Sequence, residues 1–401
     1  MSEWKKVKLK DCCIKIGSGS TPKGGSMVYV NSGTSLIRSQ NVYNLSFDYN
    51  GLTHITEDAA NKLKGVTVFN EDILLNITGD SVARTCIVPK EVLPARVNQH
   101  VAIIRTDRKK MNWRFLNYYL ASPKMQAHML SLAVGKGASR NALTKQMIEN
   151  FEVPYPPLST QRRIATILPR YDSLIENYQK QIKLLEEAAQ RLYKEWFVDL
   201  RFPGHENTNI VDGVPEGWEK KSIGEIGEYL NGFAFKPSDW QELGKPIIKI
   251  KEMGNGVTNE TPRNSGERVP AKYLIKAGDL LFSWSATLMV IIWSGEEGWL
   301  NQHLFKVTPV KGIDREFLLQ SISNTIVEFQ NLTTGSTMKH IQRNKLDQVF
   351  VNVPNAEIMK RYSDISEKTR SNILSLQSQL RLLTEARNRL LPKLMSGAII
   401  H

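Results

Sequence analysis

An Asn-Gln-His trio occurs twice in this chain, at 98–100 and again at 301–303. Asn and Gln side chains carry a donor and an acceptor together, the pattern that pairs with the edge of an adenine base. A polar trio that leads into an apolar stretch also suits a turn that satisfies buried backbone groups. Residues shared by two copies of a domain tend to serve the scaffold, so we expect Asn98 and Asn301 to be structural. The positions whose role stays open are Gln99, His100, Gln302 and His303.

A glycine-rich turn precedes each trio, with GSGSTPKGG at 17–25 and NGFAFKP at 231–237. Neither turn has the GK[ST] of a Walker phosphate loop or a GxGxxG that opens a helix. The simplest interpretation is a surface turn. The functional interpretation is that backbone amides and hydroxyls meet DNA phosphates, and a lysine at corresponding places in both turns favours it. The candidates from these turns are Ser18, Ser20, Thr21, Lys23 and Lys236.

Polar and basic side chains also lie in two stretches of mixed pattern, at 36–42 and 246–253. From these stretches the candidates for DNA contact are Arg38, Gln40, Asn41, Lys249 and Lys251. Two later segments, at 136–145 and 336–345, mix small hydroxyls with basic residues before an expected helix start. Such a combination binds phosphate well, although a capped helix start with solvated flanks explains the same residues. The candidates there are Lys136, Ser139, Arg140, Lys145, Ser336, Thr337, Lys339 and Lys345.

The chain of 401 residues has a formal net charge of +13, and the excess is uneven. Residues 1–156 hold 21 basic and 12 acidic side chains, whereas residues 218–354 hold 16 and 15. A basic excess favours a polyanionic partner such as nucleic acid, and a lysine-biased solvated surface is the plainer alternative. Three cysteines, no zinc spacing and no long apolar run predict a reduced, cytoplasmic protein without a membrane span or a metal. No catalytic motif is present, so we expect a binding protein and no catalytic residue.

The two sets of candidates belong to two copies of one domain. Trp4, DILL at 72–75 and the first trio recur in order as Trp218, DLLF at 279–282 and the second trio. The offset between the copies falls from 214 to 203 residues, as small loop deletions in a duplicated domain produce. Each copy mixes short strands with helices expected at 113–132 and 314–331, which predicts an α+β fold. Two like halves favour a partner with its own two-fold symmetry, and B-DNA is the commonest.

A long helix follows each copy. In the first helix the apolar positions alternate steps of four and three, which is the seam of a coiled coil. The second helix has one step out of phase between Thr369 and Ile373, and we expect Pro392 to close it. Pro169 predicts a bend in the first helix. The seam of the first helix is Ile164, Leu168, Tyr171, Ile175, Tyr178, Ile182, Leu185, Ala189, Leu192 and Trp196.

We expect the two helices to pair antiparallel with each other, because each follows a like domain. The alternative is pairing with another chain or packing on a different subunit, and both arrangements are compatible. The full prediction is two tandem homologous α+β domains, each followed by a long helix, the helices forming an antiparallel coiled coil with pseudo-two-fold symmetry. The expected boundaries are 1–156 for the first domain, 157–200 for its helix, 201–217 for a linker, 218–354 for the second domain, 355–396 for its helix and 397–401 for a tail.

Four segments resemble the specificity (S) subunit of type I restriction-modification systems. PPLSTQRRIATIL at 156–168 is similar to that family's helix start, and EWFVDLRFPG at 195–204 to the junction after it. VPEGWEKKSIGEIG at 214–227 resembles the start of a target-recognition domain, and RNRLLPKLMSG at 387–397 resembles the end of the second helix. The resemblance covers essentially the whole chain.

The resemblance implies that each domain reads one half of a split, asymmetric double-stranded DNA target. It also implies that the helices dock two methyltransferase (modification) subunits, which bind S-adenosylmethionine and methylate adenine. Restriction/translocase subunits would add ATP- and Mg-dependent translocation and cleavage, so the cofactors belong to partners and this chain has none of its own. Two other classes stay open, namely a coiled-coil protein whose basic domains bind RNA or protein, and an enzyme with an unrecognised site.

Overall fold

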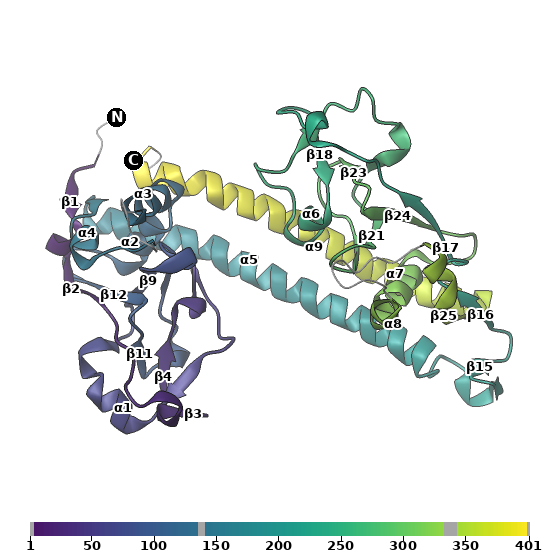
Figure 1. Cartoon of the computed structure of the whole chain (residues 1–401), viewed down its shortest axis with the longest axis horizontal. Helices are drawn as coiled ribbons and strands as arrows, with labels where there is room; N and C mark the ends of the chain where they lie inside the picture. The colour runs from purple at the N-terminus through teal and green to yellow at the C-terminus, as the bar shows by residue number, and fades with distance from the viewer. Residues whose placement is uncertain (1–3, 135–140, 333–342, 399–401) are drawn as a thin grey trace. The chain divides into compact units, whose positions relative to one another are not determined.

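The computed structural model describes residues 4–134, 141–332 and 343–398. The chain divides into two compact units (Figure 1). The first unit comprises Met1–Ile175 with Leu383–His401, and the second comprises Glu176–Leu382. Two long helices, α5 (Leu158–Tyr193) and α9 (Ala356–Ser396), each contribute one end to the first unit and the other end to the second. The compact units therefore do not follow the linear order of domain and helix in the sequence.

The first unit is built on a four-stranded antiparallel sheet with the order β10-β9-β12-β2. A five-stranded sheet with the order β3-β7-β4-β11-β8 adjoins it, and in this sheet β4 and β11 run parallel. A third, two-stranded sheet pairs β1 with β13. The strands are β1 (Lys6–Lys8), β2 (Cys13–Ser18), β3 (Tyr29–Val30), β4 (Thr34–Ile37), β5 (Val42–Tyr43), β6 (Ser46–Phe47), β7 (Thr53–Ile55), β8 (Thr67–Val68), β9 (Ile73–Asn76), β10 (Thr85–Ile87), β11 (Ala95–Val97), β12 (Val101–Thr106) and β13 (Glu152–Pro154).

The second unit repeats this plan. Its antiparallel sheet has the order β17-β24-β21-β22, and its second sheet has the order β19-β18-β23-β20 with β18 and β23 parallel. A two-stranded sheet pairs β16 with β25, as β1 pairs with β13. The strands are β14 (Ile210–Val211), β15 (Val214–Pro215), β16 (Glu219–Ser222), β17 (Gly227–Asn231), β18 (Lys245–Ile248), β19 (Arg263–Asn264), β20 (Leu274–Ile275), β21 (Leu280–Ser283), β22 (Met289–Ile292), β23 (Gly298–Leu300), β24 (Leu304–Pro309) and β25 (Phe350–Val353).

The repeated strand order and the shared parallel pair confirm the duplicated α+β domain that the sequence predicts. The register agrees as well, because Ile104 of β12 faces Ile73 while Val307 of β24 faces Leu280. Both pairs connect the strand that follows the Asn-Gln-His trio to the strand that follows the aspartate of the DILL or DLLF segment. The trios therefore occupy the same place in the two domains.

Short helices close each domain, and polar caps fix where they begin. Asn112 accepts a hydrogen bond from the Phe115 amide at the start of one helix, and Asp314 accepts one from the Phe317 amide at the corresponding helix. The helices expected at 113–132 and 314–331 are each divided into two. A new helix starts after Ser122, with Pro123 as its first residue, in the first domain, and after Thr325 in the second domain. The helices are α1 (Glu57–Lys62), α2 (Trp113–Leu120), α3 (Pro123–Ala133), α4 (Lys145–Glu149), α6 (Ile250–Asn255), α7 (Arg315–Asn324) and α8 (Ile326–Asn331).

Both units contain an antiparallel pairing of α5 with α9. In the first unit, Asp172 near the start of α5 bonds Arg387 near the end of α9 (3.0 Å). In the second unit, Trp196, in the π-helical turn Lys194–Val198 after α5, packs against Tyr362 near the start of α9 (ring centroids 6.0 Å apart). Every seam residue expected in α5 and its π-helical turn is buried or half-buried, as a coiled-coil seam requires.

The alternation of four and three from Ile358 and Tyr362 predicts Ile365 as the next seam position of α9, and this prediction is wrong. Ile365 is 44% exposed, and the side chains buried on that stretch are Ser366 and Arg370. The buried position shifts because Arg370 forms an ion pair inside the unit, which an apolar pattern does not reveal. Pro392 lies within α9 and does not close it; the helix ends at Ser396, before Gly397 in a left-handed conformation (φ 76°).

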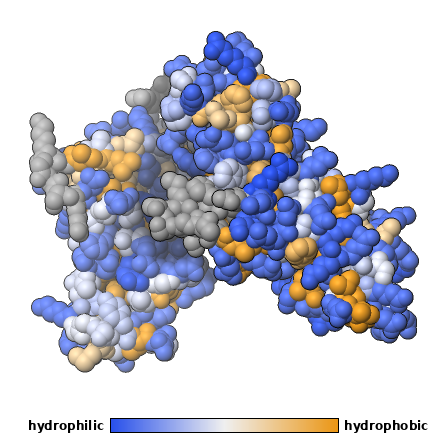
Figure 2. Space-filling view, turned by 45° about the vertical axis from the view of Figure 1, so that its right-hand side comes forward, coloured by the Kyte–Doolittle hydropathy of each residue, from blue (hydrophilic) through white to orange (hydrophobic). Residues whose placement is uncertain are grey.

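The outer surface is mainly polar. Figure 2 shows a face on which hydrophilic residues predominate and apolar areas are small and separate. Among the residues that the structure describes, no helix is both long and apolar enough to cross a membrane. Isolated apolar side chains of this kind are normal on a protein surface.

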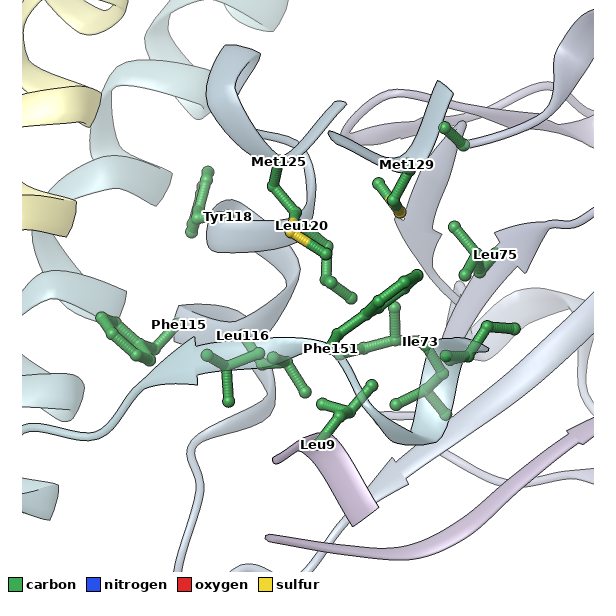
Figure 3. Packing of buried hydrophobic residues seen from close by; sticks show 14 of the residues in the cluster. Leu9, Ile73, Leu75, Phe115, Leu116, Tyr118, Leu120, Met125, Met129 and Phe151 are labelled. Atoms are coloured by element: carbon green, nitrogen blue, oxygen red, sulfur yellow. The ribbon is translucent and has the colours of Figure 1, made fainter. Parts of the chain in front are cut away.

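The core of the first unit joins the domain to the helix pair. Phe115, Leu116 and Phe151 are fully or almost fully buried in one cluster that also contains residues of β9 and η1 (Leu9–Cys12) (Figure 3). The same cluster includes Ile164 of α5 and Leu394 of α9. In the second unit, Phe317 and Phe282 share a cluster with Tyr193 of α5 and Tyr362 of α9. Each domain is therefore fixed to one end of each long helix by continuous apolar packing.

Candidate nucleic-acid interface

The Asn98–His100 turn of the first domain is a corner at which five strand ends meet. It joins β11 of one sheet to β12 of the other. The Asn98 amide donates to the Ile37 carbonyl at the end of β4 (3.0 Å), and the His100 carbonyl accepts from the Ile77 amide just after β9 (3.0 Å). Just beyond the end of β2, the Gly19 amide donates to the Val101 carbonyl (2.9 Å). The turn therefore positions the loops that follow β2, β4 and β9.

The Asn301–His303 turn makes the same bonds in the second domain. The Asn301 amide donates to the Ile248 carbonyl at the end of β18 (3.1 Å). The Trp284 amide after β21 donates to the His303 carbonyl (3.4 Å), and the Gly232 amide after β17 donates to the Leu304 carbonyl (3.0 Å). The side chain of the asparagine is part of the corner in both domains. Asn98 Oδ1 accepts from the His100 amide (3.1 Å) and Asn301 Oδ1 from the His303 amide (3.5 Å), and both asparagines are buried, as the structural interpretation expects.

The backbone of each glycine-rich turn packs closely against the backbone of the corner in its domain. A Cβ atom at Gly19 would lie 2.1 Å from the Val97 carbonyl oxygen, and one at Gly232 would lie 2.1 Å from the Asn301 carbonyl oxygen. Backbone approaches backbone there, which only glycine permits. The Gly19 and Ser20 amides both donate within the protein, the latter to the Val97 carbonyl (3.0 Å). These two amides are not free to bind phosphate, whereas Ser18, Ser20, Thr21 and Lys23 of this turn are exposed.

The side chains at the first corner form a hydrogen-bonded chain. Thr21 in the glycine-rich turn donates to Gln99 Oε1, and Gln99 Nε2 lies 3.0 Å from His100 Nε2. His100 Nδ1 shares a hydrogen bond with the Thr78 hydroxyl (2.6 Å). Gln99 is exposed and His100 is half-buried. Three loops therefore hold one exposed amide and one imidazole in a fixed orientation.

The second corner holds the same pair more loosely. Gln302 Nε2 lies 3.4 Å from His303 Nε2, and the His303 ring packs beside Trp284 (centroids 5.6 Å apart). The position of Thr21 is taken by Ala234, which has no hydroxyl. His303 Nδ1 is buried and has no hydrogen-bond partner among the described residues. The shared pair is thus supported by hydroxyls in one domain and by an indole in the other.

Arg38 and Gln40 converge on one backbone oxygen in the turn after β4. Arg38 Nη2 donates to the Gly51 carbonyl (2.7 Å), and Gln40 Nε2 donates to the same oxygen (3.3 Å). Asn41 is fully buried, and its side chain accepts from the Arg38 amide (3.0 Å) and donates to the Asp48 carbonyl (2.9 Å). Asn41 therefore holds the turn in shape and exposes no atom to a base. Gln40 is exposed and Arg38 is half-buried.

Lys249 and Lys251 occupy the corresponding turn after β18. The Lys249 amide donates to Glu252 Oε2 (3.1 Å), as the Arg38 amide donates to Asn41. Lys249 Nζ lies 4.5 Å from the centroid of the Trp240 ring, within the range of a cation–π contact. Lys251 is exposed, and its Nζ lies 3.5 Å from a Glu260 carboxylate oxygen. The two turns share their backbone support and differ in the side chains that they carry.

The remaining candidates lie in the glycine-rich turns, in two later short helices, or outside the described residues. Lys145 is the first residue of α4, with Nζ 3.5 Å from Glu149, and Thr144 caps that helix. Lys345 lies in a 3-10 helix and its Nζ donates to Gln348 (3.1 Å). The candidates exposed near the glycine-rich turns are Ser18, Ser20, Lys23 and Lys236. The candidates that lie outside the described residues are Lys136, Ser139, Arg140, Ser336, Thr337 and Lys339.

Three residues at these places escaped the sequence analysis. Thr78 holds His100, Trp284 packs beside His303, and Trp240 lies beside Lys249. Thr78 and Trp284 lie just after the DILL and DLLF strands, so aligning the two copies could have predicted that both lie beside the trio. Trp240 is 48% exposed, and an exposed indole near a lysine pattern is a usable indicator of a contact surface. Among the described residues, no group of His, Cys, Asp or Glu is arranged to hold a metal ion.

Comparison with known proteins agrees with this duplicated architecture. The family model for the type I restriction modification DNA specificity domain matches the chain twice, at residues 1–187 and 215–381. The chain belongs to this family and is a specificity subunit, with two target-recognition domains, whose family supplies recognition while catalysis lies in other subunits. The resemblance seen in the sequence is confirmed.

Relatives match along the whole chain. The type I restriction enzyme MjaIX specificity subunit of Methanocaldococcus jannaschii is 24% identical over 99% of this chain and 94% of its own length. The HindI specificity subunit of Haemophilus influenzae is 23% identical over 100% of both chains. The crystal structure of a type I restriction-modification S subunit from M. genitalium superposes with a TM-score of 0.61 at 14% identity, over 98% of this chain and 96% of that one. This structural likeness shows a common fold.

Proposed function

We propose that this chain gives a type I restriction-modification complex its DNA address, each domain reading one half of a split, asymmetric duplex target. The observation that carries the proposal is the pair of corners. Both domains bring the same strand ends together in the same way, yet the exposed side chains beside the corners differ. A common frame with different side chains is what two half-sites of different sequence require.

The proposed contacts divide into two kinds. Hydroxyls and lysines of the glycine-rich turns, such as Thr21, Lys23 and Lys236, meet the sugar-phosphate backbone and set affinity. Lys145 and Lys345, with the candidates in 136–140 and 336–339, are proposed for the same role. The side chains beside the corners meet the base edges in the major groove, where each base pair has its own pattern of donors and acceptors.

The proposed partners are double-stranded DNA, two methyltransferase subunits and the restriction/translocase subunits. Leu174 and Leu184 of α5 and Leu382 of α9 are 45, 53 and 54% exposed, and apolar side chains on the outer faces of a helix pair support docking there. S-adenosylmethionine, ATP and Mg belong to those partners in this proposal. The chain itself contributes recognition and assembly.

The test is a map of methylated adenines in DNA from cells that carry the cognate methyltransferase with or without this chain. We expect one split motif that appears only when the chain is present. Its two halves give the target of each domain, and the interval between them gives the spacer.

No chain-dependent motif, in cells whose methyltransferase is present and active, contradicts the proposal. Retention of RNA or of a protein by the purified chain, with no preference among duplexes, then supports a coiled-coil interaction protein. Turnover of a substrate by the chain without partners supports an enzyme.

A further inference from the structure

The turn after β4 and the turn after β18 are equivalent places with different residues. Arg38 directly follows Ile37, whose carbonyl holds the Asn98 amide, and Lys249 directly follows Ile248, whose carbonyl holds the Asn301 amide. Both Arg38 and Lys249 donate their own amide to a side chain three residues later. The backbone of each residue is therefore fixed on both sides, and only the side chain changes between the domains.

The neighbouring Gln-His pair does not change. Gln99 with His100, and Gln302 with His303, are the same two residues at equivalent places in the two corners, with Nε2–Nε2 distances of 3.0 and 3.4 Å. A pair that is identical in both domains cannot distinguish two half-sites of different sequence. A residue at an equivalent, rigid place that differs between the domains can do so.

We infer that Arg38 and Lys249 are the specificity-determining residues of their domains, each donating to a purine edge in the major groove beside a Gln-His pair that contacts both half-sites alike. This inference rests on the proposed function and deepens it. Arg and Lys are the side chains that pair with O6 and N7 of guanine, so each half-site should contain a guanine that one of them reads.

The contacts of the two side chains fit this role. The guanidinium of the half-buried Arg38 is oriented by one bond, from Nη2 to the Gly51 carbonyl, beside the exposed Gln40. Arg38 Nε is buried and has no hydrogen-bond partner among the described residues, so Nη1 and the second hydrogen of Nη2 are the donors left to meet a base. Holding them at one orientation lowers the entropy lost on binding. Lys249 is steered by the face of Trp240, a partner that leaves all three ammonium donors available.

The experiment uses the full complex of this chain with its methyltransferase and maps methylated motifs for Arg38→Gln and Lys249→Gln. Glutamine is shorter than arginine and lysine but retains hydrogen bonding, and it pairs with adenine in place of guanine. We expect Arg38→Gln to change one base position in the first half-site only, and Lys249→Gln to change one position in the second half-site only. The preference for guanine at that position should fall roughly tenfold to a hundredfold, the loss of one paired base contact.

Three further variants make the outcome decisive. Arg38→Lys should keep guanine, because lysine also donates to its acceptors. Lys23→Gln, at an exposed position of the glycine-rich turn that is proposed to meet phosphate, should leave the motif unchanged while lowering overall methylation, and Gln99→Ala should lower methylation without changing the motif. The inference is overturned if Arg38→Gln or Lys249→Gln gives the wild-type motif at any level, or if Gln99→Ala alters a base. A wild-type chain that confers no motif overturns instead the proposed function on which the inference rests.

Discussion

The polar contacts at the helix pair differ between the two units. In the second unit, Arg370 of α9 forms two hydrogen bonds to the Glu316 carboxylate of α7 (2.8 and 2.7 Å), and the side chains are only 8% and 5% exposed. In the first unit, Arg387 of α9 bonds Asp172 of α5 (3.0 Å) with side chains 23% and 29% exposed, and Tyr118 of α2 donates to the same carboxylate. One junction is a buried ion pair and the other is a half-exposed one.

The two copies therefore keep the same strand order but differ in the polar contacts at the helix pair. The apolar clusters supply most of the burial in both units, so either polar arrangement can align the helices. A buried pair leaves a much larger penalty when one partner is lost, because the remaining charge has no water to replace it. The second unit should therefore depend on its ion pair far more than the first unit depends on its own.

The largest effect is expected for Arg370→Met. It leaves Glu316 buried and unpaired, so the free energy of unfolding should fall by about 3–5 kcal/mol. Arg387→Met should cost about 1 kcal/mol or less, because solvent reaches both partners of that pair. Urea unfolding followed by tryptophan fluorescence measures the loss, and hydrogen exchange should place the loss for Arg370→Met in α7 and the start of α9.

The double variant Glu316→Gln with Arg370→Met serves as the control, since it removes both charges. It should recover much of the stability lost by the single change. Equal losses for Arg370→Met and Arg387→Met would contradict the contrast between the two junctions.

An intermediate effect is expected at the corners, where the two units agree. Gly19→Ala and Gly232→Ala each place a Cβ against a backbone carbonyl, so each should destabilise its unit by about 1–3 kcal/mol. Gly17→Ala is the matched control, because a Cβ there meets nothing within 4 Å. Thermal unfolding and motif mapping together test this expectation. A stable Gly19→Ala variant with an unchanged motif would show that the close approach is dispensable.

The smallest effect concerns Glu186 of α5, which lies near Arg370 and Glu316. Burial raises the pKa of Glu186, Arg370 opposes the shift and Glu316 adds to it. A raised folded-state pKa means that the ionised form is disfavoured in the folded protein, so stability is lost as the pH rises through that pKa. Glu186→Gln should therefore gain less than about 1 kcal/mol at neutral pH and nothing once the pH lies below the unfolded-state pKa. Glu176→Gln, at an exposed site on the same helix, is the control, and a gain that persists at low pH would contradict this explanation.

In both domains a basic residue on the strand after the trio forms an ion pair with the aspartate of the DILL or DLLF segment, although the two basic residues are not aligned in the sequence. Arg105 of β12 bonds the buried Asp72 (2.7 Å) and the Thr67 carbonyl (3.1 Å). In the second domain Lys306 of β24 bonds Asp279 (2.8 Å) and the Leu274 carbonyl (3.3 Å). The aspartates correspond in the sequence but the cations do not, because Lys306 faces Leu281 while Ile103 faces the equivalent Leu74. The longer side chain of Arg105 reaches Asp72 from a position two residues further along its strand than the position from which Lys306 reaches the equivalent Asp279.

The duplication, the α+β class, the helix pair and the structural role of Asn98 and Asn301 could all be predicted from the sequence. These follow from local patterns, namely apolar spacing, caps and repeated motifs, which need no knowledge of distant contacts. Only the tertiary structure decided that Asn41 is buried, that the Gly19 and Ser20 amides are occupied, and that Arg38 and Lys249 hold equivalent places. It also decided that Ile365 faces outward while Arg370 faces inward. The reason is that each of these outcomes depends on a contact with a residue elsewhere in the chain, and the spacing of neighbouring residues does not indicate which residue that is.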